Sequence, residues 1–261
     1  MIMNDLRVTL VQPDIIWQKN QENLLKYSEI LDNSPVVTDL LLFPEMFQTG
    51  FSVDPSGIAE KMDGESVRWM KRTAERFNCA VAGSLIIKEN RRFYNRLIYI
   101  DQYENLTWYD KRHLFAYAGE KAKFTAGLRQ LIVPLKDWHI SFQICYDLRF
   151  PVWARNRGDY DVLVNLANWP DSRSEVWTTL LRARAMENQS YVIGVNRVGT
   201  DHNNIKYTGK SMVIDPRGKI HSEIAETREG LLSVTLSREE LDKYRNDFPA
   251  WQDRDNFEIA V

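Results

Sequence analysis

The chain has 261 residues, a length that suits one α/β domain or two smaller ones. Its 34 lysines and arginines nearly balance 36 aspartates and glutamates, which argues against nucleic-acid binding through bulk charge. No apolar run approaches the ~18 residues of a membrane helix, no secretory leader is visible, and two cysteines cannot build a disulfide framework. We therefore expect a cytoplasmic protein with reduced thiols that binds neither nucleic acid nor membrane.

The first half of the chain alternates between helical and strand-like apolar patterns. Apolar residues at helical spacing predict helices over residues 20–31 and 65–77. Residues 40–43 form a short continuous apolar run, which is typical of a strand covered on both faces. The strands expected in this half are residues 6–12, 40–43, 80–87, 95–100 and 106–109.

The second half repeats this alternation after a looser segment at residues 113–128. Two capping boxes, Ser172 with Glu175 and Ser237 with Glu240, each predict the start of a helix. The expected helices are residues 172–189 and 237–246, and the expected strands are residues 130–133, 139–145, 161–166, 191–196, 210–214, 219–223 and 231–235.

Nothing in the sequence divides the chain, so we expect one domain over residues 1–261. Two strand-rich halves with flanking helices predict an α/β fold of two sheets packed face to face, with the helices outside. A doubly wound parallel sheet is the alternative, although residues 11–14 lack its glycine-rich fingerprint. The P-loop, zinc-protease and serine-hydrolase motifs are also missing, which weighs against those chemistries.

Three polar residues stand at the ends of apolar strands. Glu45 follows residues 40–43 and a proline, Lys111 follows residues 106–109, and Cys145 ends a strand where a charged segment begins. Each residue also has an interpretation without a function. Glu45 is then a solvated carboxylate, Lys111 part of a charge-mixed turn, and Cys145 a small buried hydrophobic residue. A cysteine on a tight strand-to-helix turn instead points into a crevice, near backbone N–H groups that favour a thiolate.

The three residues together supply the parts of an acyl-transfer site. A thiol with a pKa of ~8.5 is only a few per cent thiolate at neutral pH, so it gains from an adjacent base. Burial raises the pKa of a carboxylate and a nearby lysine lowers it, and the sequence leaves that balance open. A fixed ammonium stabilises the oxyanion of a tetrahedral intermediate.

The segments around these residues resemble a known family. Residues 42–46 (LFPEM), 109–115 (YDKRHLF) and 144–151 (ICYDLRFP) are similar to the three signature blocks of the nitrilase, or carbon–nitrogen hydrolase, superfamily. The order Glu, Lys, Cys and the spacings match as well, and residues 182–188 resemble the helix after the catalytic cysteine. The likeness covers about residues 5–235.

The resemblance implies a four-layer αββα sandwich and a role for each polar residue. Glu45 is then the general base, Cys145 the nucleophile and Lys111 the oxyanion stabiliser, with the backbone N–H of Tyr146 as a second donor. Many members carry a second glutamate, which Glu120 matches; it orients Lys111 or the water, or is a solvated loop residue. Neither a cofactor nor a metal is implied. A homodimer is implied, and we expect the helix and tail of residues 237–261 at its surface.

Within the superfamily, the chain most resembles the omega-amidase branch. The Gly-Glu pair at residues 119–120 and the stretch 164–170 (VNLANWP) carry this likeness. Members of the branch hydrolyse small-molecule amides, namely 2-oxoglutaramate or 2-oxosuccinamate, to the 2-oxo acid and ammonia. Attack by Cys145 would give a thioester, which a water activated by Glu45 then hydrolyses.

Such a substrate carries a carboxylate, so its pocket requires a guanidinium. Arg149 and Arg173 are the candidates, although for Arg149 we favour a structural ion pair with Asp147. The aromatic residues expected to wall the pocket, or else to fill the core or an interface, are Phe115, Tyr117 and Trp169.

Two other functions fit the same residues. Hydrolysis of a carbamoyl group or a nitrile uses the same triad, and only the polarity of the pocket separates these substrates. A catalytically silent interaction protein is the other alternative, but such a protein has no chemical reason to keep all three polar groups at strand ends.

Overall fold

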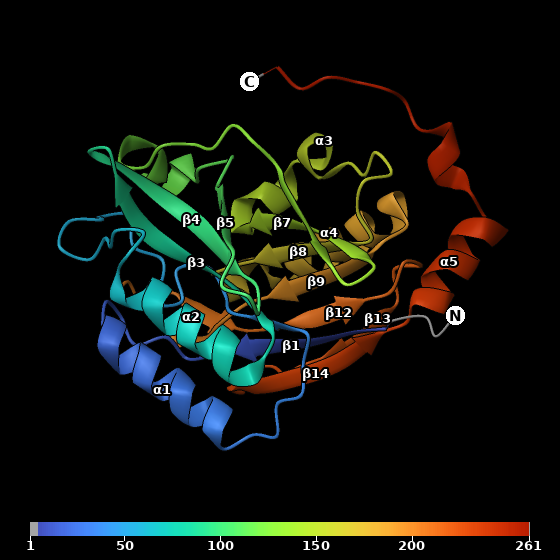
Figure 1. The fold of residues 1–261 in the computed structure, drawn as a ribbon. Helices are drawn as coiled ribbons and strands as arrows, with labels where there is room; N and C mark the ends of the chain where they lie inside the picture. The colour runs from blue at the N-terminus through green and yellow to red at the C-terminus, as the bar shows by residue number, and fades with distance from the viewer. Residues whose placement is uncertain (1–4, 261) are drawn as a thin grey trace.

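Two six-stranded β-sheets lie face to face at the centre of the protein (Figure 1). The structure is a computed structural model that describes residues 5–260. Apolar side chains of both sheets meet in one core, where Val8 and Leu42 of the first sheet pack with Phe142 and Val164 of the second. With helices on the two outer faces, the layers follow the order helix, sheet, sheet, helix. This arrangement confirms the αββα sandwich and excludes the doubly wound sheet.

The first sheet combines five strands of the first half with the last strand of the chain, in the order β14-β1-β2-β3-β4-β5. Strands β1, β2 and β3 are parallel, and the other neighbours pair antiparallel. Strand β4 is antiparallel to β3, and β5 is antiparallel to β4. Strand β5 therefore runs in the direction of β2 and ends at the same edge of the sheet. The bounds are β1 Leu6–Gln12, β2 Leu40–Leu42, β3 Ala80–Glu89, β4 Arg92–Ile100, β5 Leu106–Asp110 and β14 Gly230–Leu236.

The second sheet has the order β13-β12-β9-β8-β7-β6, again with three parallel strands, β7, β8 and β9, at its centre. A separate hairpin, β10–β11, follows β9. The bounds are β6 Leu131–Leu135, β7 Trp138–Ile144, β8 Val162–Leu166, β9 Tyr191–Val195, β10 Val198–Thr200, β11 Lys206–Thr208, β12 Met212–Ile214 and β13 Ile220–Glu223.

Amphipathic helices form the outer layers. Helices α1 and α2 cover the first sheet, and α4 covers the second (Figure 1). In α2, Val67, Met70 and Ala74 face the sheet, because positions three and four apart share one side of a helix. The helices are α1 Asn20–Asp32, α2 Glu65–Phe77, α3 Pro151–Ala154, α4 Ser174–Asn188 and α5 Arg238–Asp247, with 3₁₀ turns η1 Ala116–Ala118, η2 Glu120–Ala122, η3 Cys145–Arg149, η4 Asp171–Arg173 and η5 Ala250–Asp253.

One of the two predicted capping boxes is wrong. Helix α4 starts at Ser174 without a side-chain cap, because Ser172 lies in the preceding 3₁₀ turn. At α5 the cap is present, with Ser237 Oγ accepting a hydrogen bond from the N–H of Glu240 at 3.3 Å. The β10–β11 hairpin is an element that the apolar pattern did not predict.

The chain after α5 lies against the second half of the same molecule. The N–H of Trp251 donates to Gln189 Oε1 at 3.0 Å, and Ile259 packs against the central core. The place of residues 237–261 at a dimer surface stays a prediction, and residue 261 lies outside the described residues. None of the helices in residues 5–260 is long and apolar enough to cross a membrane.

Candidate active site

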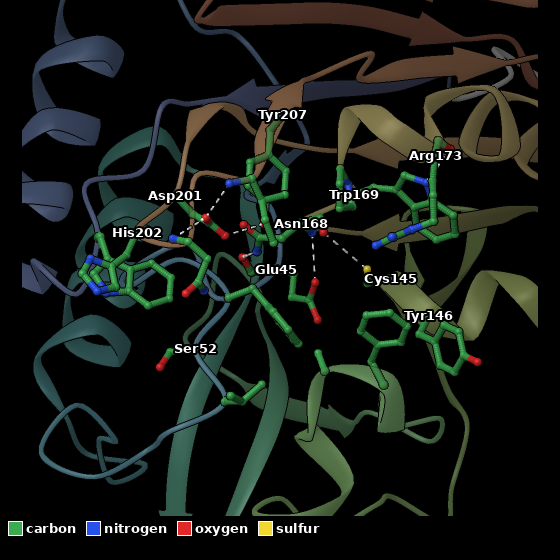
Figure 2. A pocket seen from close by; sticks show the side chains of 18 of the residues that line it. Glu45, Ser52, Cys145, Tyr146, Asn168, Trp169, Arg173, Asp201, His202 and Tyr207 are labelled. Atoms are coloured by element: carbon green, nitrogen blue, oxygen red, sulfur yellow. Dashed lines mark hydrogen bonds between the residues drawn. The ribbon is translucent and has the colours of Figure 1, made fainter.

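The ends of strands from both sheets meet at one cavity of about 390 Å³ (Figure 2). Glu45 follows β2 and Lys111 follows β5, at the same edge of the first sheet. Cys145 follows β7 of the second sheet. All three side chains line the cavity, so the structure brings together the three residues that the sequence singled out.

Glu45 is fully buried and held by hydrogen bonds on both carboxylate oxygens. Its Oε1 accepts from Asn95 Nδ2 at 2.7 Å and from Lys111 Nζ at 2.8 Å. Its Oε2 accepts from the N–H of Asn168 at 2.9 Å, at the end of β8. These contacts exclude the alternative of a solvated strand-end carboxylate.

Lys111 lies between two buried carboxylates. Its Nζ is 2.8 Å from Glu45 Oε1 and 2.9 Å from Glu120 Oε2. Burial alone would lower the pKa of Lys111, but the charges of Glu120 and Glu45 outweigh it and raise the pKa above its ordinary value. The raised pKa favours the charged form of Lys111 beside Glu45.

Glu120 is also buried, so it is not the solvated loop residue of the alternative interpretation. Its Oε2 accepts from the N–H of Phe115 at 2.6 Å, which ties it to the loop after Lys111. Burial raises the pKa of Glu120, while Lys111 opposes that shift.

Cys145 sits on a sharp turn between β7 and η3. Its φ of +45° is unusual for a residue other than glycine, and such strain collects at functional sites. The Sγ atom is 3.9 Å from the carbonyl oxygen of Asn168. Burial and the nearby Glu45 carboxylate raise the pKa of the thiol well above its ordinary value, although Lys111 opposes them. This direction runs against the expectation that backbone N–H groups at the turn favour a thiolate, and it places a base beside a protonated thiol.

The Asp147 carboxylate holds the turn between β7 and η3 through hydrogen bonds. One carboxylate oxygen accepts from the N–H of Ile144 at 3.0 Å and from the Tyr109 hydroxyl at 2.7 Å. The other accepts from the N–H of His113 at 2.9 Å and lies 2.8 Å from its Nδ1. Asp147 thus joins the cysteine turn to the loop that carries Lys111.

The predicted ion pair between Arg149 and Asp147 is wrong, because Asp147 is engaged elsewhere. The Arg149 guanidinium instead lies 5.2 Å from the ring centre of Trp169, on the cavity wall. Arg173 lies 5.5 Å from the ring centre of Phe115, on the same wall. Within residues 5–260, neither guanidinium forms an ion pair shorter than 4.0 Å.

Of the predicted aromatic residues, Phe115 and Trp169 line the cavity, as does Tyr146. Tyr117 does not, because it projects from η1 with 92% of its surface exposed, so its predicted place in the wall is wrong. No group of three or more His, Cys, Asp or Glu side chains in the described part of the chain has an arrangement that would hold a metal ion.

Sequence reasoning missed two parts of the site. Asn168 and Asn95 hold the Glu45 carboxylate, and Asn168 directly extends the pattern of polar residues after buried strands. The other part is a wall formed by the loop after β1 and the tip of the β10–β11 hairpin, including Trp17 and His202. No apolar periodicity marks that wall.

Comparison with known proteins identifies the family of the chain. The model of the carbon–nitrogen hydrolase family matches residues 7–246. The chain therefore belongs to this family, within the nitrilase superfamily, and is a hydrolase that acts on carbon–nitrogen bonds. Within the superfamily it falls in the omega-amidase branch, whose members are amidohydrolases.

The relatives match along nearly the whole chain. Omega-amidase YafV of Escherichia coli (strain K12) is 39% identical over 257 residues, which are 98% of this chain and 100% of that protein. The 2-oxoglutaramate amidase of Bacillus subtilis (strain 168) is 32% identical over 251 residues, 94% of this chain and 96% of that protein. The structure of XC1258 from Xanthomonas campestris, a CN-hydrolase superfamily protein with an arsenic adduct in its active site, has a TM-score of 0.96 and 41% identity, covering 99% of this chain and 100% of that one.

Proposed function

We propose that the protein hydrolyses the terminal amide of small 2-oxo dicarboxylic acid monoamides, such as 2-oxoglutaramate and 2-oxosuccinamate, to the 2-oxo acid and ammonia. The observation that carries this proposal is one cavity that holds Glu45, Lys111 and Cys145 together with the guanidinium groups of Arg149 and Arg173. The activities printed in the names of the Escherichia coli and Bacillus subtilis relatives also support it.

The reaction begins with a protonated thiol. Cys145 Sγ attacks the amide carbon while Glu45 accepts the thiol proton, because the raised pKa of Cys145 requires a base at this step. The oxyanion forms between Lys111 Nζ and the backbone N–H of Tyr146. Glu45 then gives the proton to the amide nitrogen, the carbon–nitrogen bond breaks and ammonia leaves a thioester on Cys145.

Hydrolysis of the thioester returns the enzyme to its resting state. Glu45 accepts a proton from a water molecule, whose oxygen attacks the thioester carbon. The carbon–sulfur bond breaks, the 2-oxo acid leaves, and the proton returns to Cys145. Glu120 holds Lys111 beside the oxyanion throughout, through the ion pair at 2.9 Å.

The guanidinium groups determine which acyl groups bind. A carboxylate prefers a guanidinium that has no acidic partner, because two parallel hydrogen bonds then form. Arg149 and Arg173 offer such groups on the aromatic wall of the cavity. The expected homodimer and the cytoplasmic location remain predictions.

Ammonia release from a substrate panel tests the proposal. The panel contains 2-oxoglutaramate, glutamine, an N-carbamoyl amine and a nitrile. We expect the highest kcat/KM for 2-oxoglutaramate. Preference for glutamine would contradict the substrate assignment, and preference for the carbamoyl compound or the nitrile would favour those alternatives. Absence of turnover with every compound would support a catalytically silent protein.

A further inference from the structure

The cavity has a second wall that the hydrolysis of a primary amide does not use. We call it the distal wall and define it by Trp17, His202, Asn203 and Ile205. The rings of Trp17 and His202 are stacked, with centres 5.9 Å apart and planes at 16°. Ile205 lines the same part of the cavity, beside Asn203. The distal wall therefore combines a stacked aromatic pair with one aliphatic and one amide side chain.

The geometry of the hairpin holds this wall in place. Asp201 Oδ1 accepts from the N–H groups of Asn203 at 2.8 Å and of Ile205 at 3.0 Å. Asp201 Oδ2 accepts from the Tyr207 hydroxyl at 3.0 Å. On the other side, Trp17 packs against Gly50, where an added Cβ would lie 3.3 Å from the indole ring. The wall is thus built before any ligand binds.

The catalytic carboxylate lies between the two walls (Figure 2). Cys145 is on the side of Trp169, Arg173 and Tyr146, whereas Asp201 and His202 are on the opposite side of Glu45. In the proposed reaction Glu45 gives its proton to the amide nitrogen. The acyl group therefore points to the arginines, and the amide nitrogen points to the distal wall.

The acyl side and the distal side of the cavity also differ in charge. The cationic groups Arg149 and Arg173 belong to the acyl side, because they stack on Trp169 and Phe115. On the distal side, the described lining residues include no lysine or arginine, and Asp54 is exposed at the rim. This side therefore suits a neutral group and disfavours an anion.

Ammonia has no substituent that would reach the distal wall. The cavity of about 390 Å³ falls in the range of ~300–1,000 Å³ that holds drug-sized ligands. A five-carbon amide is smaller than such a ligand and leaves part of the cavity unfilled. We propose that the distal wall binds an apolar substituent on the amide nitrogen, so that the enzyme also hydrolyses monoamides with a neutral N-substituent to the dicarboxylate and a primary amine.

This inference rests on the proposed function, and its chemistry is the same. Cys145 Sγ forms the bond to the carbonyl carbon, Glu45 transfers the thiol proton to the substituted nitrogen, and the carbon–nitrogen bond breaks. The primary amine leaves past the distal wall. Water then hydrolyses the thioester as before, so no further reactant is needed.

The test compares three substrates: 2-oxoglutaramate, its N-benzyl amide and its N-carboxymethyl amide. Ammonia, benzylamine and glycine release are measured separately for the wild type, W17A, H202A and Y103A. We expect the wild type to release benzylamine, with a kcat/KM at least about tenfold above that for the anionic N-carboxymethyl amide. W17A and H202A should each lower kcat/KM for the N-benzyl amide at least about tenfold more than for the primary amide.

Y103A is the matched control, because Tyr103 is an exposed aromatic residue outside the cavity. It should not change the ratio between the two substrates. Release of ammonia from 2-oxoglutaramate without release of benzylamine would overturn the inference alone. Equal losses on both substrates in W17A and H202A would overturn it as well. Failure to release ammonia from 2-oxoglutaramate would instead contradict the proposed function.

Discussion

Glu45 carries the proton in both halves of the proposed reaction, so its ability to ionise decides the rate. Its carboxylate is fixed by Asn95, Lys111 and Asn168 and has no freedom to turn toward solvent. Glutamine at this position would keep the size of the side chain but lose the ability to accept a proton and the negative charge beside Lys111. The Glu45→Gln variant should therefore lose at least ~100-fold in kcat/KM for 2-oxoglutaramate, the usual share of a general base.

The measurement is ammonia release, with circular dichroism to show that the variant is folded. Glu239→Gln, on the exposed face of α5, is the matched control and should keep the wild-type rate. An unchanged rate in Glu45→Gln would assign the base to another residue.

The sequence was sufficient to single out Glu45, Lys111 and Cys145, which line one cavity, but not to predict their protonation. Glu45, Lys111 and Cys145 stand out in the sequence because each is a chemically reactive or charged residue that follows an apolar strand. The pKa of Cys145 depends on the balance of burial, Glu45 and Lys111, which only distances resolve. Tyr117 was misplaced for a related reason, because the direction of a side chain on a 3₁₀ turn is not visible in the sequence.

The turn between β7 and η3 holds Cys145, the proposed nucleophile, in a strained backbone conformation. Asp147 stabilises that turn with hydrogen bonds from Ile144, Tyr109 and His113. In Asp147→Asn, one acceptor becomes a donor that faces other buried donors. Since an unsatisfied buried group costs ~1–3 kcal/mol, we expect the free energy of unfolding to fall by at least ~2 kcal/mol.

Urea denaturation measures this change, and kcat should fall with it because the turn also aims the Tyr146 N–H. Asp255→Asn, at an exposed position of the tail, should change stability by less than ~0.5 kcal/mol. Equal stability of Asp147→Asn and the wild type would show that the turn does not depend on this carboxylate.

Elements with a strong apolar period were predicted well, and those without one were not. Helix α2 has the predicted bounds, Glu65–Phe77, because Val67, Met70 and Ala74 form a clear stripe. The β10–β11 hairpin escaped prediction because its strands are three residues long and its turn is held by Asp201 rather than by apolar contacts. That hairpin carries His202, Asn203 and Ile205 of the distal wall. Because the sequence did not predict the hairpin, it did not predict this wall either.

At the scale of the whole molecule, an ionic cluster links the two sheets at the edge of the core. Asp39, just before β2, pairs with Arg7 of β1 at 2.7 Å and with Lys136 of the β6–β7 turn at 2.7 Å. Burial alone would raise the pKa of Asp39, but these two cations lower it from 3.8 to about 2.

The lowered pKa predicts how stability depends on pH. The folded state holds Asp39 ionised more strongly than the unfolded state does, so its contribution is present above about pH 4 and is lost as the pH falls toward about 2. The Asp39→Asn variant lacks this contribution. The difference in free energy of unfolding between wild type and variant should therefore shrink between pH 4 and pH 2 in urea denaturation. A difference that stays constant over that range would contradict the assignment.

The sandwich itself was predictable, because two strand-rich halves with flanking helices allow few other arrangements. The register between the sheets was not, since the contacts that join them, such as Phe142 with Tyr99, lie far apart in the sequence. That register brings Cys145 of one sheet to the same cavity as Glu45 and Lys111 of the other.

The proposed mechanism requires Cys145 to form a thioester with the acyl part of the amide. Mass spectrometry of the protein, quenched in acid during turnover of 2-oxoglutaramate, tests it most directly. The wild type should carry the acyl group on the peptide that contains Cys145, and Cys145→Ala should carry none and release no ammonia. An acyl group on another residue, or ammonia release by Cys145→Ala at the wild-type rate, would contradict the mechanism.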